Sequence, residues 1–318
     1  MTKVLVTGGA GFIGSHVVDA IISLGYEAVV IDNLTTGKLD NIDKNARFYP
    51  IDINDNKLKQ IFTKEKPDYV IHLAAQTQVS SSITNPRFDA NININGTISL
   101  LQQCALHRTK KIILSSSGAV YGNSQNLPLK EDQQAGPISF YGLSKYAAEL
   151  YTQLFGTLHE LDYTILRYAN VYGPRQNPHG ESGVLAIYIS NLLTNKDLIV
   201  HGDGEQTRDF IFVKDVAKAN LQALHYGSRE TVNISSNTET SINQLISELS
   251  SLVINQLKVK YMEPRPGDIK HSCLDNNKAR CLLRWQPAYS LTEGLEETIA
   301  YVTNPNYVKE THQAKVSN

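Results

Sequence analysis

Residues 3–14 read KVLVTGGAGFIG, and this stretch determines which fold the remainder of the chain should take. Lys3–Thr7 is a nearly continuous apolar run, typical of a buried parallel strand. A turn with three glycines follows, and the apolar residues of Phe12–Leu24 then repeat with helical spacing. Glycine lets the backbone turn tightly and approach a pyrophosphate, which the N-terminus of the next helix attracts. The stretch predicts a dinucleotide-binding turn at Gly8, Gly11 and Gly14, against the alternative of a glycine-rich turn without a ligand.

Short runs rich in Val, Ile and Leu alternate with longer amphipathic stretches through the first 170 residues. This alternation predicts an α/β fold, a Rossmann-like doubly wound parallel sheet covered by helices on both faces. Strands are expected at Glu27–Ile31, Tyr69–Leu73, Lys111–Ser115 and Thr164–Tyr168, and helices over Asn93–Arg108 and Tyr141–Glu160.

The composition changes after about Asn170. Residues 172–183 read YGPRQNPHGESG, which is typical of a loop. A helix near Val184–Leu193 and strands near Leu198–His201 and Asp209–Val213 are predicted beyond it. We expect residues 1–170 to form a Rossmann domain and residues 171–318 mainly a smaller C-terminal α/β substrate-binding region, with a strand near residues 231–234 rejoining the first sheet.

Composition narrows the class of protein. The net charge of the 318 residues is −1 and the charges are interspersed, so neither nucleic acid nor an anionic membrane is an expected partner. No apolar run approaches membrane-spanning length, and a strand is predicted from Lys3, which leaves no room for a signal peptide. The three cysteines form no ligand-like pairing and the nine histidines no ligand spacing, so we expect free thiols, no metal and a cytoplasmic location.

Asp32 ends the second predicted strand, 18 positions after Gly14. A carboxylate there can accept both ribose hydroxyls and would repel a 2′-phosphate, so the sequence favours NAD over NADP. Asp52 and Ile53 would suit the adenine edge, and small residues after the fourth strand would let the dinucleotide lie close. Cofactor contacts are thus expected at Phe12, Ile13, Asp32, Asn33, Asp52, Ile53, Leu73, Ala74, Ala75 and Ser115.

Tyr141 and Lys145 stand four apart in YGLSK at the start of a predicted helix, which puts both on one helix face. A phenol is protonated at neutral pH, and a nearby ammonium favours its ionised form, so Tyr141 could remove a hydroxyl proton. Such a pair also occurs by chance on solvated helix faces. The Ser115–Ser117 run favours the catalytic interpretation, because it follows a parallel strand where such sheets place ligands.

The motifs TGGAGFIGSH, SSSGAVYG, YGLSK, RYANVYGPRQ and GEQTRDFIFVKDVAKA occur in the order seen in extended short-chain dehydrogenase/reductases. The chain resembles the NAD-dependent epimerase/dehydratase group of that family, and within it the UDP-glucose 4-epimerases and their relatives. The resemblance implies that Tyr141 is the base, Lys145 its helper and Ser117 the third catalytic member. It also implies a homodimer built on paired helices, a cofactor contact at Asn95 and UDP-sugar contacts at Asn170, Arg208, Arg265 and Asp268.

Two positions depart from patterns in the family. Related 4,6-dehydratases carry an acidic pair directly after the catalytic Ser or Thr, where this chain has Gly118 and Ala119; the Glu of the decarboxylases is also missing. Ser272 stands where some 4-epimerases have a bulky Tyr, which predicts room for N-acetylated sugars.

The expected function is therefore NAD-dependent 4-epimerisation of a UDP-hexose through a transient 4-keto sugar. Two alternatives remain open at this point. One is another nucleotide-sugar oxidoreductase of the family, such as a keto-sugar reductase or a UDP-glucuronate 4-epimerase. The other is a non-catalytic NAD-sensing module, against which the intact Ser117, Tyr141 and Lys145 set argues.

Overall fold

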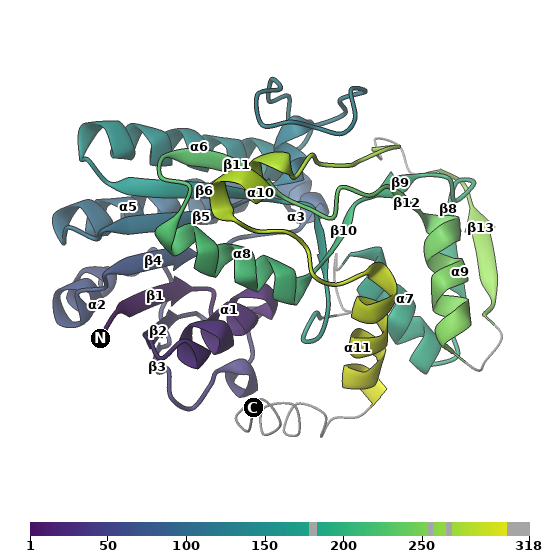
Figure 1. The fold of residues 1–318 in the computed structure, drawn as a ribbon, viewed down its shortest axis with the longest axis horizontal. Helices are drawn as coiled ribbons and strands as arrows, with labels where there is room; N and C mark the ends of the chain where they lie inside the picture. The colour runs from purple at the N-terminus through teal and green to yellow at the C-terminus, as the bar shows by residue number, and fades with distance from the viewer. Residues whose placement is uncertain (178–182, 254–256, 265–268, 304–318) are drawn as a thin grey trace.

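The computed structural model describes residues 1–177, 183–253, 257–264 and 269–303. Its main sheet has seven strands, all paired in parallel, in the order β11-β6-β5-β4-β1-β2-β3 (Figure 1). This confirms the doubly wound α/β fold. The strands are β1 Lys3–Thr7, β2 Glu27–Ile31, β3 Arg47–Tyr49, β4 Tyr69–His72, β5 Lys111–Ser117, β6 Asp162–Tyr168 and β11 Glu230–Ile234.

Alternate residues of each central strand face opposite layers of helices, as the twofold repeat of a strand requires. On β1, Val4 and Val6 join a core cluster with side chains from α1 (Phe12–Ser23) and α8 (Val213–His225). Leu5 points the other way, into a cluster with α2 (Leu58–Glu65), α5 (Thr97–Leu106) and α6 (Phe140–Leu158). Both faces are therefore covered, and the carboxyl ends of the strands point towards the second region, at the right of Figure 1.

The helix predicted over Asn93–Arg108 starts differently from the expectation. After the short helices α3 (Val79–Thr84) and α4 (Pro86–Ala90), residues Asn91–Gly96 form a π-helical turn, η2, before α5 begins. Gly96 lies against Ile53, and an added Cβ there would come within 2.3 Å of the Ile53 Cδ1 atom. Such turns are frequent at functional sites.

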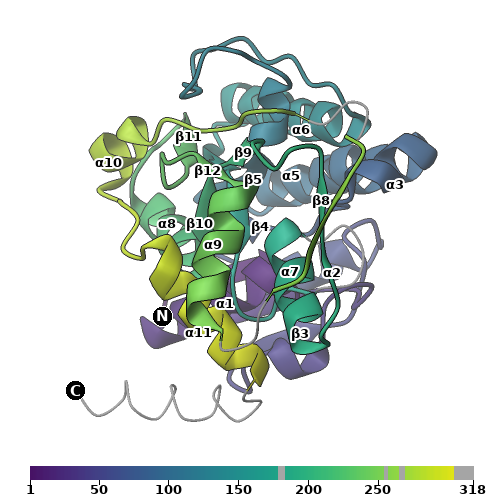
Figure 2. The ribbon, with the colours of Figure 1, turned by 90° about the vertical axis from the view of Figure 1, so that its right-hand side faces the viewer.

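The second region, which faces the viewer in Figure 2, has its own elements. Its apolar core includes Tyr172, Phe212, Leu245 and Leu295. The region holds three two-stranded sheets, β10-β7, β12-β9 and β13-β8, of which only the second is antiparallel. Its elements are β7 Asn170–Tyr172, α7 Val184–Leu193, β8 Leu198–His201, β9 Thr207–Arg208, β10 Phe210–Phe212, β12 Thr240–Ser241, α9 Ile242–Leu252, β13 Val259–Met262 and α11 Leu291–Thr303. Helix α10 (Asn277–Leu283) instead packs against β11 and α8 of the first region, which also holds two 3-10 turns, η1 Leu39–Asn41 and η3 Gly118–Tyr121.

The two regions are joined by more than one crossing of the chain. β10 runs directly into α8, which packs against α1, and β11 then pairs with β6 at the edge of the main sheet. The strand expected near residues 231–234 thus extends the first sheet. None of the helices in the described ranges is long and apolar enough to cross a bilayer.

Candidate active site

The glycine turn between β1 and α1 has the geometry that a dinucleotide requires. Gly8 has a φ of +72°, and a Cβ there would lie 2.7 Å from the backbone nitrogen of Ala74. A Cβ on Gly14 would lie 2.0 Å from the carbonyl oxygen of Gly8. Side chains would fill this cradle, so only glycine lets the backbone present itself to a pyrophosphate at the N-terminus of α1.

The carboxylate of Asp32 fixes the end of β2 against this turn. Its Oδ2 atom accepts the Ala10 N–H at 3.0 Å and its Oδ1 atom accepts the Leu34 N–H at 2.8 Å. A carboxylate has about four lone-pair sites, so each oxygen can still accept from a ribose hydroxyl. The side chain is buried next to the glycine turn, where it fits the adenosine half of NAD.

Other predicted cofactor residues gather at the same edge of the sheet. Asn33 donates through Nδ2 to Asp52 Oδ2 at 2.7 Å, which joins the loops after β2 and β3. The N–H groups of Leu73 and Ala74 donate to the carbonyl and the hydroxyl oxygen of Thr7, at 3.1 and 3.2 Å. Phe12 and Ile13 open α1, Ala75 follows β4, Ser115 is buried near the end of β5, and Ile53 is buried beneath Gly96.

Asn95 lies apart from this group. Its side chain is exposed and its Nδ2 atom donates to Asn91 Oδ1 at 3.2 Å. The buried asparagine of η2 is Asn93, two residues earlier. The sequence NINING carries three alternating asparagines, and nothing in their spacing distinguishes the buried one.

Ser117 ends β5 and lies beside the phenol of Tyr141, and the buried Lys145 follows Tyr141 by one turn of α6. Ser139 caps α6 by accepting the Gly142 N–H at 3.1 Å, so Tyr141 stands in the first turn and Lys145 on the next, on the face packed against the sheet. Ser117 Oγ accepts the Ala119 N–H at 3.2 Å, which leaves its own proton for the phenol of Tyr141. The geometry suits proton transfer to or from a ligand hydroxyl.

Burial sets the protonation of the pair. It raises the pKa of Tyr141, the Ser117 hydrogen bond lowers it, and the negative charge of Asp89 raises it. It lowers the pKa of Lys145 to about 8, against the opposing effect of Asp89 and Glu149. With the protein's own groups alone, the phenol is therefore protonated at neutral pH and the lysine is mostly an ammonium.

A buried polar network next to this pair was missed by sequence reasoning. Gln76 Nε2 and Asn93 Nδ2 donate to Asp89 Oδ1, at 2.8 and 3.2 Å. Asn93 Nδ2 also donates to Ser144 Oγ at 3.0 Å, and Ser144 Oγ donates to the Tyr141 carbonyl at 3.0 Å. The network ties the segment before α5 to the first turn of α6.

The residues expected to hold the nucleotide sugar come from the second region. Asn170 is exposed at the start of β7, and its N–H donates to the Asp209 carbonyl at 2.9 Å. Arg208 is half-buried on β9 and donates through Nη1 to the Thr207 carbonyl at 2.7 Å. Ser272 is half-buried, whereas Arg265 and Asp268 lie outside the described residues.

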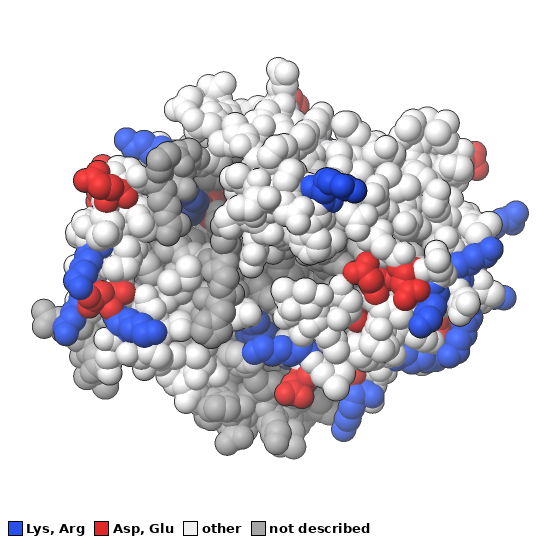
Figure 3. All heavy atoms as spheres, turned by 180° about the vertical axis from the view of Figure 1, so that it is seen from behind, with Lys and Arg blue, Asp and Glu red and all other residues white. Residues whose placement is uncertain are grey.

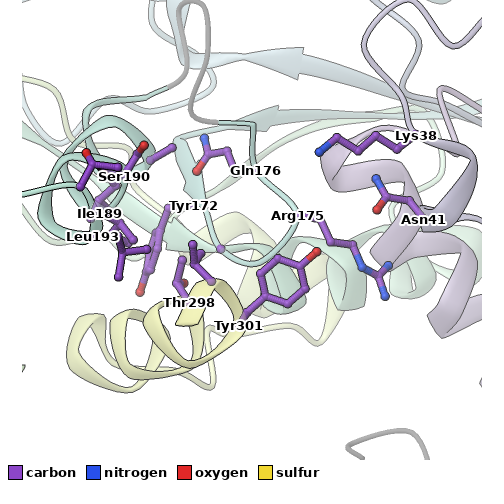
Figure 4. A pocket seen from close by; sticks show the side chains of 15 residues that line it. Lys38, Asn41, Tyr172, Arg175, Gln176, Ile189, Ser190, Leu193, Thr298 and Tyr301 are labelled. Atoms are coloured by element: carbon purple, nitrogen blue, oxygen red, sulfur yellow. Dashed lines mark hydrogen bonds between the residues drawn. The ribbon is translucent and has the colours of Figure 1, made fainter. Parts of the chain in front are cut away.

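A separate cavity of about 340 Å³ opens between α7, α11 and the loop after β2, and none of the predicted site residues that the structure describes lines it. Lys38, Asn41 and Arg175 lie on one side of it, and Ile189 and Leu193 on the other (Figure 4). The guanidinium of Arg175 forms an ion pair with the carboxylate of Asp19 on α1 at 2.8 Å, which connects it to the first region. The face opposite that of Figure 1 carries basic and acidic side chains intermingled (Figure 3).

Comparison with known proteins identifies the family. The model of the NAD dependent epimerase/dehydratase family matches residues 4–235. A putative UDP-glucose 4-epimerase of Methanocaldococcus jannaschii is 44% identical over 304 residues, which cover 95% of this chain and 99% of that protein.

Two solved structures share the fold over nearly their whole length. The UDP-glucose 4-epimerase of Thermotoga maritima, solved with UDP-glucose, has a TM-score of 0.92 at 44% identity and covers 95% of this chain and 99% of its own. The UDP-N-acetylglucosamine 4-epimerase of Methanobrevibacter ruminantium M1, solved with UDP-N-acetylmuramic acid, has a TM-score of 0.91 at 38% identity. The match covers 95% of this chain and 98% of that chain. Together with the glycine cradle and the Ser117, Tyr141 and Lys145 cluster, these matches show that the chain belongs to the NAD-dependent epimerase/dehydratase family, with NAD as its cofactor.

Proposed function

We propose that the protein interconverts the C4 epimers of a UDP-hexose, UDP-glucose and UDP-galactose first, through a transient 4-keto sugar. One observation carries this proposal: the phenol of Tyr141 lies beside Ser117 at the carboxyl end of β5, one helical turn before the buried Lys145, in a protein whose first turn is shaped for a dinucleotide. The identity to UDP-sugar 4-epimerases over nearly the full chain supports it.

In this reaction Tyr141 removes the proton of the sugar 4-hydroxyl and later returns it. NAD⁺ held at the glycine turn and Asp32 would supply a reversible hydride acceptor for C4 of the sugar. The ammonium of Lys145 stabilises the phenolate, and Ser117 donates to the reacting oxygen. The hexose must turn over between the two transfers, so the site has to hold the UDP firmly and the hexose loosely.

The second region would supply the residues that hold the UDP firmly. Arg208 is proposed as a phosphate ligand, a role to which a planar guanidinium is suited, and Asn170 would contact the sugar diphosphate. Arg265 and Asp268 are proposed for the second phosphate contact and the uridine ribose. Residues 1–170 would then hold NAD and residues 171–318 mainly the nucleotide sugar, in a cytoplasmic enzyme whose described cysteines are all free thiols.

Two features bear on neighbouring activities of the family. Gly118 and Ala119 open η3 directly after Ser117, and neither can protonate or deprotonate a sugar, which argues against dehydration. Half-buried Ser272 in place of a bulky aromatic supports acceptance of N-acetylated hexoses. A UDP-glucuronate 4-epimerase or a keto-sugar reductase is the second candidate.

Product analysis tests the proposal. Purified protein is incubated separately with UDP-glucose, UDP-N-acetylglucosamine and UDP-glucuronate, and the sugars are resolved by chromatography while absorbance at the NADH band is followed. We expect UDP-galactose from UDP-glucose, some N-acetylated product, and no net change of cofactor. If a further incubation with a 4-keto sugar and NADH consumed NADH stoichiometrically, the protein would be a reductase. If UDP-glucuronate alone were turned over, it would be the substrate in place of UDP-glucose.

We also propose a homodimer formed by α5 and α6. Leu143, Leu150, Leu154 and Leu158 form an exposed apolar stripe along α6, with exposures between 47 and 67%. A stripe of this kind on a helix is typical of an interface between subunits.

Leu154→Asp should convert the dimer into a monomer, because it places a charge in the middle of that stripe. Light scattering coupled to gel filtration at micromolar concentration measures the mass. Leu24→Asp is the matched control, since Leu24 is 54% exposed but lies at the end of α1, on the other face of the sheet. A monomeric wild-type protein would rule the dimer out.

A further inference from the structure

Asp89 is a buried carboxylate, and the hydrogen bonds that it accepts do not require a negative charge. Its side chain is 1% exposed, and Oδ1 accepts from Gln76 and Asn93. Oδ2 is buried without a hydrogen-bond partner among the described residues. An asparagine could accept the same two hydrogen bonds through its amide oxygen without burying a charge, which is costly unless the charge is compensated.

The compensation that the structure offers is the ammonium of Lys145. Lys145 is buried on α6, behind Tyr141, in the helix that the Asp89 network braces through Asn93 and Ser144. The other carboxylate acting on Lys145 is that of Glu149, which already forms two hydrogen bonds with Arg167, at 2.9 and 2.6 Å. Asp89 is thus the carboxylate near Lys145 that no described arginine pairs with.

We propose that Asp89 is a positioning residue of the catalytic centre, whose buried negative charge keeps Lys145 in its ammonium form beside Tyr141. The proposal deepens the proposed function and rests on it for the consequence on turnover. Asp89 contacts neither substrate nor reacting atoms in this role and acts through Lys145.

The charged and titratable groups around Lys145 support the assignment. Burial lowers the pKa of Lys145 to about 8, which is only slightly above neutral pH. The Asp89 charge opposes this shift, so its loss would leave much of Lys145 uncharged at neutral pH. The imidazole of His72 is neutral, because burial and the Lys145 charge lower its pKa to about 3. The groups concerned are Tyr141 and Glu149 on α6, His72 on β4, Asp89 on α4 and Arg167 on β6.

Asp89→Asn should lower the pKa of Lys145 by at least about one unit, the usual effect of removing an opposite charge nearby. The pKa is measured in NAD-loaded protein with carbon-13 at the lysine Cε positions, and Lys145→Arg assigns the signal. Gln76→Met is the matched control: it removes a neutral partner of the same carboxylate and should destabilise the network without lowering the Lys145 pKa. Asp89→Ser, which admits water, carries the same expectation should the amide variant fail to fold.

The pH profile of turnover gives the second readout. The Asp89 charge raises the pKa of both Lys145 and Tyr141, so its removal should move both limbs of the profile towards lower pH. A merely structural loss would reduce turnover at every pH and leave the limbs in place. An unchanged Lys145 pKa in folded Asp89→Asn protein overturns the proposal. Lack of epimerase activity in the wild type would refute the proposed function instead, and the Lys145 titration would still decide the role of Asp89.

Discussion

Tyr141→Phe should lower turnover at least about a hundredfold, the usual scale for a lost acid–base group, while the protein keeps its fold and its NAD. The substitution removes only the phenolic oxygen. That oxygen lies beside Ser117, whose hydroxyl lowers the pKa of the phenol, and Tyr141 stands one helical turn before Lys145. Phenylalanine keeps the ring that packs in the first turn of α6, so the loss should fall on kcat. The measurement is the initial rate of UDP-galactose formation from UDP-glucose.

Tyr146→Phe is the control for this substitution. Tyr146 lies on the same helix but packs against the cluster of Val120, Tyr121, Leu129 and Leu274, outside the Tyr141 face. Its change should leave turnover within a factor of about two, as for substitutions away from a site. Near-normal turnover by the Tyr141→Phe protein would remove Tyr141 from the mechanism, and an equal loss in both variants would indicate damage to α6.

The parts of the site that sequence could predict are those encoded over short distances. The glycine turn is determined by residues 3–14, and its steric reason is the approach of Gly14 to Gly8 six residues earlier. Tyr141 and Lys145 share a helix face because four residues make about one turn. The parallel sheet follows from repeated apolar runs, although its strand order does not, because β1 lies between β2 and β4 only through crossovers.

What the sequence could not supply are contacts between distant segments. Asn93 reaches Ser144 across 51 positions, and Gln76 meets Asp89 only because η2 and α4 fold back beneath the end of β4. The sequence does not distinguish a buried Asp from a solvated one. Propensity alone would place Asp89 on the exposed surface of a short helix. Packing decides which of three asparagines in η2 turns inward, and the sequence alone does not distinguish the buried Asn93 from the exposed Asn95.

The ion pair of Glu149 and Arg167 is another such contact, and Glu149 lies one turn of α6 after Lys145. Both side chains are buried, and Nε and Nη2 of Arg167 donate to the two carboxylate oxygens at 2.9 and 2.6 Å. Burial lowers the pKa of Arg167, but the hydrogen bonds and charge of Glu149 outweigh it and hold the pKa above its ordinary value. The guanidinium also stacks 4.8 Å from the centre of the Tyr121 ring, and Ser116 Oγ donates to Glu149 at 2.5 Å.

Arg167→Met should therefore lower the free energy of unfolding by about 3–5 kcal/mol, because it removes the cation that forms two hydrogen bonds with the buried Glu149 carboxylate. Denaturant unfolding of wild type and variant, followed by circular dichroism, measures the difference. Adding Glu149→Gln should restore much of the loss, since a neutral amide can still accept from Ser116 and no longer needs a charge partner. If the double variant were as unstable as Arg167→Met, the loss would come from the packing of the guanidinium on Tyr121 rather than from an uncompensated charge.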